Sequence, residues 1–490
     1  MTQFTSERLA FNLGRGSVPS QREIDAALAA DARPTFATSL YAEPREWGYR
    51  GLVAFTAVLL LRPQDTIHAL EPLHLAEFFA LVGIGPMVLH RMTQGKAMFR
   101  MTPETVGLML FGAVILGTIP FSIWPGGCVE VAIEYWKVVV VFVLMVNTLT
   151  APRRLEQLTW LIIVCCGYVA GRAVFDYARG INLVEDDRVT AAVGGIFGNP
   201  NDLALVMVTF MPAALMVALM PRHSILRRAT AAGVAMMMLA AIVFTKSRGG
   251  ALGLGAMLVA MIFLGRRIRR GFAVMAIGAV LAAAPFMPAS FWHRMATIGN
   301  EQADAEEYTG SYSSRRILLE EGMRVFWQYP LTGVGAGQFK NYNPPERRER
   351  WREAHNAIVQ VAADIGIFGV CAFLFVIIRG FVAAAATRRM LEKPRKPRAP
   401  DPLRLVLTET DRQTLYAYTA ATTAGIVGWF TCAMFASVAY SWTFYYLLAL
   451  IVSSRELTRA RLSAARVIVR GERASVPSRG FSPQSATGAA

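Results

Sequence analysis

Residues 356–380 read NAIVQVAADIGIFGVCAFLFVIIRG and contain only two charged side chains, Asp364 and Arg379. A helix of about 20 apolar residues crosses the roughly 30 Å hydrocarbon core of a bilayer. Further runs of this kind bring the predicted spans to twelve, at 49–62, 70–89, 103–124, 127–149, 156–178, 201–220, 229–246, 249–265, 271–289, 356–380, 414–436 and 438–454. The sequence therefore predicts an all-α fold, a polytopic membrane helix bundle.

Composition also places the chain in the membrane class. Of its 490 residues, 54% are hydrophobic and only 17% are charged, a balance that does not fit a single soluble core. The formal net charge of +16 does not indicate nucleic acid, because the basic residues gather in short segments beside the apolar runs, as the positive-inside rule expects. The lipid bilayer is the predicted partner.

The basic segments predict the orientation of the spans. If the N-terminus is cytoplasmic, every second span ends in the cytoplasm, and each of these exits is basic. The exits contain Arg91, Lys96 and Arg100; Arg153 and Arg154; Arg222, Arg227 and Arg228; Arg266, Arg267, Arg269 and Arg270; residues 388–398; and the tail from Arg455. Both termini are then cytoplasmic, and only the link between the ninth and tenth spans is a long external loop.

This topology divides the chain into five regions. They are a cytoplasmic N-terminal segment at 1–48, nine spans at 49–289, a periplasmic catalytic loop at 290–355, three spans at 356–454 and a basic, disordered cytoplasmic tail at 455–490. The first region is polar and lacks the apolar core of a signal peptide. Within the loop, Leu319, Met323 and Phe326 recur at helical spacing and predict a helix on the membrane face, with Ser314 as its N-cap.

No metal site or cofactor is predicted. All five cysteines lie in apolar runs without zinc-type spacing: Cys128, Cys165, Cys166, Cys371 and Cys432. Packing is the prediction for them. The acidic neighbours Asp304, Glu306 and Glu307 fit a solvated loop better than a metal site. The run Gly333–Gly337 follows Pro330 in a loop and lacks the lysine and threonine of a nucleotide P-loop.

Four short motifs stand in a fixed order relative to the spans. They are Gly198-Asn199-Pro200-Asn201 at the sixth span, Ser247-Arg248-Gly249-Gly250 between the seventh and eighth, Arg315 with Leu319 followed by the segment 330–339 (PLTGVGAGQF), and His355-Asn356 followed by Gly366 and Gly369. Taken together, this set resembles the O-antigen ligase and polysaccharide polymerase superfamily of bacterial envelope enzymes.

The resemblance implies a metal-independent, inverting glycosyltransferase of the bacterial inner membrane, active at the periplasmic face. Its donor would be a glycan on an undecaprenyl diphosphate carrier. Its acceptor would be a saccharide, either the lipid A core or a growing O-antigen or exopolysaccharide chain, and envelope-assembly proteins are possible partners. The sequence does not decide between ligation and polymerisation, and it does not give the sugar or the oligomeric state.

This reaction assigns separate tasks to arginine and histidine. The lipid diphosphate is a ready leaving group that needs cations to hold it, and the planar guanidinium binds phosphate through two hydrogen bonds. Arg248 and Arg315 are the predicted diphosphate ligands. Histidine exchanges a proton near neutral pH, and of the external histidines His355 carries the motif. His355 is therefore the predicted general base for the acceptor hydroxyl.

Two further arginines are candidate donor contacts. Arg172 lies toward the outer end of the fifth span, where it could reach a diphosphate or pair with Asp176 four residues on. Arg62 ends the first span, where it could add to a phosphate-binding basin or extend its charge to the membrane interface.

Asparagines and intramembrane acids complete the candidates. Asn356, Asn199 and Asn201 could orient the sugar, although each stands where an Asn side chain caps a helix or holds a loop. Asp364 occupies a position where relatives often carry an acid, so it could support the site or pack against another helix. Lys137 lies at helical spacing from two glutamates, which favours a structural ion pair.

A transporter or flippase that moves lipid-linked glycan without forming a bond is the alternative. Transporters of this size show repeated halves around a binding site at the membrane midplane. Here the distinctive residues gather at one face and on one loop, which favours an enzyme.

Overall fold

The computed structural model describes residues 44–93, 97–264, 287–298, 311–392 and 406–475, together with Gly95, Gly278, Pro285 and Leu403. Two compact units divide the chain. The larger consists of Ala42–Leu391 and Gln413–Leu457, and the smaller contains Glu392–Arg412 and the chain from Thr458 onward. Within the smaller unit, Leu403, Val406 and Ala465 form an apolar cluster.

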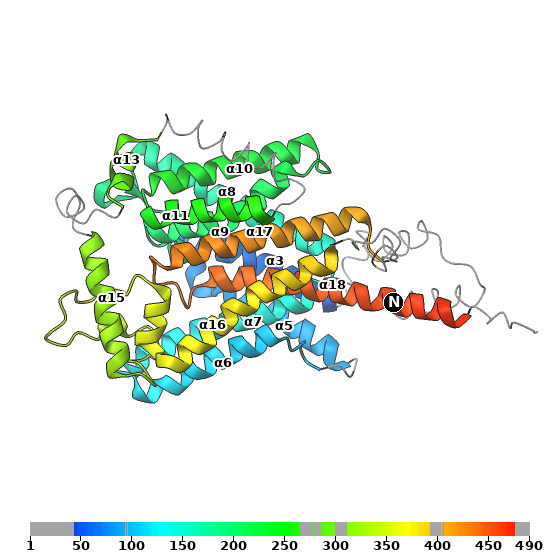
Figure 1. Cartoon of the computed structure of the whole chain (residues 1–490), viewed down its shortest axis with the longest axis horizontal. Helices are drawn as coiled ribbons and strands as arrows, with labels where there is room; N and C mark the ends of the chain where they lie inside the picture. Colours follow the sequence, from blue (N-terminus) through cyan, green and yellow to red (C-terminus); the bar gives the residue numbers. More distant parts are fainter. Residues whose placement is uncertain are drawn as a thin grey trace, which may run out of the picture. The chain divides into compact units, whose positions relative to one another are not determined.

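Long helices build the larger unit, and two of them continue into the smaller one (Figure 1). They are α3 (Pro44–Leu61), α5 (Leu75–Thr93), α6 (Pro103–Thr118), α7 (Pro125–Thr148), α8 (Pro152–Arg179), α9 (Pro200–Leu219), α10 (Ile225–Phe244), α11 (Arg248–Leu264), α16 (Ala357–Leu391), α17 (Glu409–Ala433) and α18 (Trp442–Ser475).

Short elements fill the links between these helices. They are α4 (Pro63–Thr66), η2 (His68–Leu73), η3 (Ile119–Phe121), β1 (Leu183–Val184), η4 (Glu185–Asp187), β2 (Arg188–Val189), η5 (Gly195–Phe197), α13 (Ala289–Ala296), α15 (Ser311–Gln328) and η7 (Phe339–Asn341). The strands β1 and β2 form one antiparallel pair, in which Leu183 lies opposite Val189.

The predicted fold class is confirmed. Eleven of the twelve predicted spans coincide with one of the long helices, and the remaining one, 271–289, lies almost wholly outside the described residues. Six helical stretches are each long and apolar enough to cross a membrane, counted over the described residues alone: His68–Thr93, Pro103–Phe121, Pro152–Arg179, Pro200–Leu219, Ile225–Phe244 and Ala357–Leu391.

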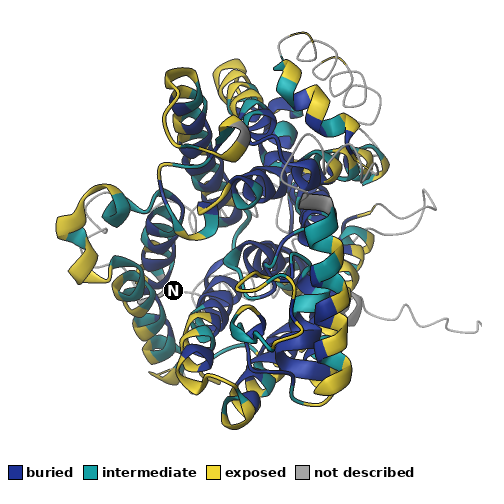
Figure 2. Cartoon of the chain, turned by 90° about the vertical axis from the view of Figure 1, so that its left-hand side faces the viewer, coloured by how far each residue is buried: buried dark blue, intermediate teal, exposed yellow. Residues whose placement is uncertain are grey.

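Helix α9 lies in the core of the larger unit and is buried along almost its whole length. Small residues let its neighbours approach. A Cβ on Gly250 of α11 would lie 2.7 Å from the Cβ of Ala204, and one on Gly425 of α17 would lie 2.5 Å from the Thr209 carbonyl oxygen. Such contacts are typical of helices packed in a membrane. Figure 2 shows the complementary pattern, in which buried surfaces lie toward the middle of the bundle and exposed surfaces on outer helices.

A buried ionic cluster ties three helices together. Glu104 of α6, which is fully buried, accepts hydrogen bonds from Arg455 of α18 (Nη1 to Oε1, 2.7 Å) and from Arg379 of α16 (Nη2 to Oε1, 2.8 Å). Arg455 is 1% exposed. Buried charges persist only when they are paired and hydrogen-bonded, so this cluster fixes how the three helices pack.

Links predicted to be external contact one another. The backbone N–H of Gly194 donates to Oδ2 of Asp65 (2.7 Å), which joins the link after α3 to the link after α8. The backbone N–H of His355 donates to Oγ of Ser437 (2.9 Å), which joins the long loop to the link between α17 and α18. These contacts agree with the predicted alternation of the spans, while the side of the membrane stays a prediction.

Two local predictions were wrong. Helix α15 begins at Ser311, so Ser314 is not its N-cap; the Ser314 hydroxyl instead donates to Oε1 of Glu349 (2.7 Å). The buried face of this helix contains Leu318 and Val325, whereas Met323 of the predicted stripe is 38% exposed, and the position of the stripe on the membrane face stays a prediction. Residues 455–475, which were predicted as part of a disordered tail, continue helix α18.

Candidate functional site

The glycine-rich segment 330–339 is docked on a break in helix α16. Gly366 has φ 68° and ψ −164°, which interrupts the helix. The break frees the N–H of Ile367 to donate to the carbonyl of Pro330 (2.8 Å). A Cβ on Gly333 would lie 2.3 Å from the carbonyl carbon of Asp364. The glycines therefore allow two backbones to touch, and this contact explains the motif without a phosphate cradle.

Asp364 fixes this docked segment from within α16. Its buried carboxylate accepts a hydrogen bond from the backbone N–H of Phe339 (Oδ1, 2.9 Å) and another from the Tyr440 hydroxyl (Oδ2, 3.2 Å). Phe339 belongs to the turn after α15, and Tyr440 to the link between α17 and α18. One side chain thus joins three segments that surround the start of α16.

Asn356 caps α16. Its Oδ1 accepts from the backbone N–H groups of Ile358 and Val359 (both 3.0 Å), and its amide donates to the carbonyl of Met434 (3.2 Å). The preceding His355 has φ 49°, an uncommon left-handed conformation for a residue with a side chain. The cap and the backbone bond to Ser437 hold His355 in this conformation.

Arg315 lies close enough to His355 for its charge to act on the imidazole. Burial, followed by the positive charges of Arg315 and Arg352, lowers the pKa of His355 from its ordinary value to about 4. The imidazole is therefore neutral at pH 7. The structure thus brings together the arginine and the histidine that were predicted to share a site, although 40 residues separate them in the chain.

Two carboxylates near this pair were missed by the sequence analysis. Burial removes part of the water around the Glu353 carboxylate and raises its pKa, whereas the charge of Lys340 and a hydrogen bond with Ser437 lower that pKa. The charge of Glu353 also acts on Asp202, in the first turn of α9. Among the described residues, no group of three or more His, Cys, Asp or Glu side chains could hold a metal ion.

Asn199 and Asn201 build the entrance of α9. Asn199 is its N-cap, with Oδ1 accepting from the backbone N–H groups of residues 201 and 202 (2.9 and 3.0 Å). Oδ1 of Asn201 accepts from Nη2 of Arg188 and from the Ser247 hydroxyl (both 2.8 Å). The two asparagines thus hold the motif at the sixth span against the Ser-Arg-Gly-Gly turn. Arg188 is a further cation at this turn that the motifs did not indicate.

Arg248 opens helix α11 at this turn. It is 8% exposed, and its Nη1 donates to Oγ1 of Thr297 (3.0 Å), just after α13. A Cβ on Gly249 would lie 3.0 Å from the Cβ of Phe435. Glycine therefore lets the turn pack against the end of α17 while Arg248 reaches toward the long loop.

Arg172 and Arg62 each pair with a nearby aspartate. Nε of Arg172 lies 2.9 Å from Oδ1 of the fully buried Asp176. Nε of Arg62 lies 2.6 Å from Oδ2 of Asp65. These pairs give both arginines a structural role. Their membership of the donor site stays a prediction.

Comparison with known proteins agrees with the motifs. Residues 233–374 match the family model described as O-Antigen ligase. None of the curated proteins compared with the chain matches it. The matched region extends from α10 into α16 and contains Arg248, Arg315 and His355. The match confirms the resemblance to the O-antigen ligase and polymerase superfamily.

Proposed function

We propose that this protein transfers a glycan from an undecaprenyl diphosphate carrier to a hydroxyl group of an acceptor saccharide at the periplasmic membrane face. The family match supports an O-antigen ligase or polymerase activity in general terms. The observation that carries the finer proposal is the electrostatic contact between Arg315 and His355. It combines a cation suited to phosphate with an imidazole that is free to accept a proton.

Arg315 and Arg248 would hold the diphosphate. In the transfer, the bond between the anomeric carbon and the diphosphate oxygen breaks, and the leaving diphosphate keeps the electron pair. Guanidinium groups stabilise this charge through paired hydrogen bonds and stay protonated throughout. Because the leaving group is already a good one, the mechanism needs no metal ion. Arg172 and Arg62 would make outer contacts with the donor.

His355 would remove the proton from the acceptor hydroxyl as its oxygen attacks the anomeric carbon from the opposite side, inverting that carbon. Burial and then the charges of Arg315 and Arg352 lower the pKa of His355 in the free protein. A bound diphosphate would offset the two cations and raise that pKa toward its ordinary value near 6.5. The imidazole would then become a better base when the donor is in place.

The asparagines would position these groups. Asn356 caps α16 directly after His355, and Asn199 and Asn201 hold the entrance of α9 near Asp202. Each side chain keeps polar atoms near the loop, where they could also meet sugar hydroxyls.

Purified full-length protein in detergent, given a lipid-linked donor and a sugar acceptor, tests the proposal. Undecaprenyl diphosphate should be released, and His355→Ala should abolish release, whereas His293→Ala, a matched change on α13, should retain it. Arg315→Lys should lose most activity, because a point charge cannot replace the guanidinium fork. Equal unfolding temperatures would show that all variants are folded.

Two outcomes would refute the proposal. Transport of donor across vesicles with no release, for any acceptor, would favour the flippase alternative. Normal release by His355→Ala would remove His355 as the base. Assays with a lipid A core acceptor and with a second repeat unit as acceptor separate ligation from polymerisation.

A further inference from the structure

A cavity of about 1140 Å³ lies between α3, α5 and α7, and the segments α4 and η2 and the side chain of Trp442 complete its wall. It is larger than the roughly 300–1,000 Å³ that is typical of small-molecule pockets. Arg248, Arg315 and His355 do not line it. The cavity is therefore separate from the residues proposed for diphosphate binding and proton transfer.

The apolar part of the cavity wall continues onto the outer surface of the bundle. Leu81 of α5 is 67% exposed and Ile133 of α7 is 53% exposed, and both side chains line the cavity. Only 11% of the most apolar stretch of His68–Thr93 is buried within the structure. A cavity with exposed apolar side chains of a membrane-spanning helix in its wall is accessible to lipid chains.

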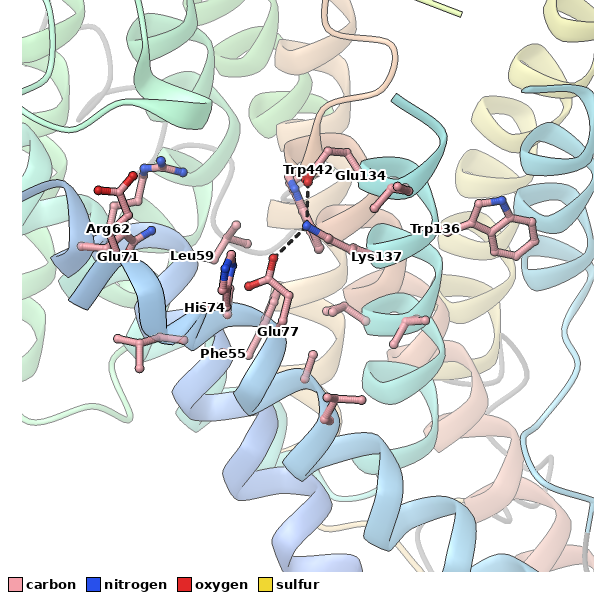
Figure 3. A pocket seen from close by; sticks show the side chains of 18 of the residues that line it. Phe55, Leu59, Arg62, Glu71, His74, Glu77, Glu134, Trp136, Lys137 and Trp442 are labelled. Atoms are coloured by element: carbon pink, nitrogen blue, oxygen red, sulfur yellow. Dashed lines mark hydrogen bonds and ion pairs between the residues drawn. The ribbon is translucent and has the colours of Figure 1, made fainter. Parts of the chain in front are cut away.

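A charged triad lies in the same wall. Nζ of Lys137 donates to Oε1 of Glu77 (2.8 Å) and to Oε1 of Glu134 (2.7 Å), as Figure 3 shows. The predicted ion pair of Lys137 with a glutamate on its own helix is confirmed, and a second partner comes from α5. Glu77 lies in the first turn of α5, directly after a link that was predicted to be external. The charged part of the cavity thus lies at the predicted outer end of that span, where lipid headgroups lie.

The triad carries an uncompensated negative charge that faces the cavity. Two carboxylates share one ammonium group, and the side chains of Lys137, Glu77 and Glu134 are 33%, 39% and 58% exposed. The whole wall has the same sign, with four acidic and two basic side chains: Asp65, Glu71, Glu77 and Glu134 against Arg62 and Lys137. Charged side chains facing the membrane are costly unless a polar partner covers them. An ammonium headgroup would be attracted to this wall, and a purely anionic headgroup would be repelled.

The hydrogen-bonding capacity of the triad favours a primary ammonium group next to a phosphate. Each carboxylate offers about four lone-pair sites, so Glu77 and Glu134 can accept further N–H donors. A primary ammonium supplies three such donors, whereas a trimethylammonium group supplies none. Lys137 has a third N–H, since its two contacts use two, and it can donate to a phosphate oxygen. His74, which lies beside Glu77 in Figure 3, offers a ring N–H to the same phosphate.

We infer that this cavity binds a zwitterionic phospholipid with a primary ammonium headgroup, of the phosphatidylethanolamine class. The ammonium group would lie on Glu77 and Glu134, the phosphate on Lys137, and the acyl chains along α5 and α7. Arg62 takes no part, because its Nε bonds Oδ2 of Asp65 (2.6 Å) and Figure 3 shows it apart from Lys137. The inference does not rest on the proposed glycan transfer. Since the triad joins two helices, the bound headgroup would hold α5 against α7.

Lipid retention tests the inference directly. The full-length protein is reconstituted in nanodiscs that contain equal amounts of phosphatidylethanolamine, phosphatidylcholine and phosphatidylglycerol with the same acyl chains, and retained lipids are identified by native mass spectrometry. Wild type should retain phosphatidylethanolamine about tenfold over phosphatidylcholine, because charged hydrogen bonds distinguish the two, and phosphatidylglycerol least. Ala80→Trp, which places a bulky side chain in the cavity wall, should reduce this retention by about tenfold. Leu89→Trp is the matched control, because Leu89 is exposed on α5 and does not line the cavity.

Glu134→Gln gives a second test that preserves the shape of the side chain. It removes one charged acceptor of the ammonium group and should also reduce retention of phosphatidylethanolamine by about tenfold. Glu130→Gln is its matched control, since Glu130 is exposed on the same helix and does not line the cavity. Both controls should retain the lipid as wild type does, and equal unfolding temperatures in detergent would show that the four variants are folded.

Several results would overturn the inference. Preferential retention of phosphatidylglycerol, or retention of no lipid, would show that the charges of the wall do not select the headgroup. Equal retention of phosphatidylethanolamine and phosphatidylcholine would remove the role of the N–H donors. Unchanged retention in either Ala80→Trp or Glu134→Gln would place the retained lipid outside this cavity.

Discussion

Replacing Gly333 by alanine should separate the glycine-rich segment from helix α16. The new Cβ would lie 2.3 Å from the carbonyl carbon and oxygen of Asp364, and the φ of 60° adds strain for an L-residue. A left-handed conformation costs about 1–2 kcal/mol, and overpacking costs about 1–3 kcal/mol. If the segment lifts, the N–H of Val334 loses the Ala363 carbonyl (3.0 Å) and the N–H of Gly335 loses the Asp364 carbonyl (2.8 Å). Losing these bonds costs about 1 kcal/mol each.

The expected loss of stability is therefore on the order of 2–5 kcal/mol, whether the segment stays seated under strain or lifts and loses the two bonds. Thermal unfolding of the detergent-purified protein measures it, and release of undecaprenyl diphosphate measures the effect on activity, which should fall because the turn leads from α15 to His355. Gly117→Ala is the control: its Cβ would meet nothing within 4 Å, at the end of helix α6. A helical Gly→Ala change should stabilise by about 0.5–1 kcal/mol. If Gly333→Ala has the same unfolding temperature and the same rate of undecaprenyl diphosphate release as the control, the docking argument is wrong.

Two further predictions concern buried and titrating charges. Glu104→Gln leaves the buried Arg455 without a full counter-charge and should lower the free energy of unfolding by about 3–5 kcal/mol. The double variant Glu104→Gln with Arg455→Met should recover most of that loss. Equal unfolding temperatures for wild type and the single variant would refute this. Arg352→Gln removes one of the cations that lower the pKa of His355 from its ordinary value to about 4. The pKa of His355 should rise, so the loss of activity on the acid side of the pH profile should begin at a higher pH. If the acid side of the profile is unchanged, His355 is not the titrating base.

The spans could be predicted from the sequence because a membrane imposes one simple demand, about 20 apolar residues in a helix. Residues 357–391 meet that demand despite the break at Gly366. The start of α15 could not be predicted in the same way. Ser314 has the chemistry of an N-cap, but its hydroxyl bonds Glu349 across the loop. A tertiary contact outweighed the local preference, as it often does at polar helix ends.

The candidate site was predicted only where a motif marked it. His355 and Arg315 stand in motifs, and the structure brings them together. Glu353 and Asp202 are 151 positions apart, and no spacing rule connects them. Their proximity arises because the start of α9 and the end of the long loop meet at the same end of the bundle. Acidic residues are frequent in that loop, so composition alone could not single out Glu353.

The break in α16 explains why the third and fourth motifs form one structural unit. Arg315 lies on α15, whose end leads into the segment 330–339 that is seated on the break. His355 lies directly before α16, and Asp364 joins that helix to Phe339 and to Tyr440. The relative position of the proposed cation and base is therefore set by backbone contacts around α16 and not by the flexible ends of their side chains. A catalytic pair needs such rigid support, since a displacement of about 1 Å can cost 100-fold in rate. The glycines of the third and fourth motifs thus serve the chemistry indirectly, by letting α16 and the turn after α15 touch.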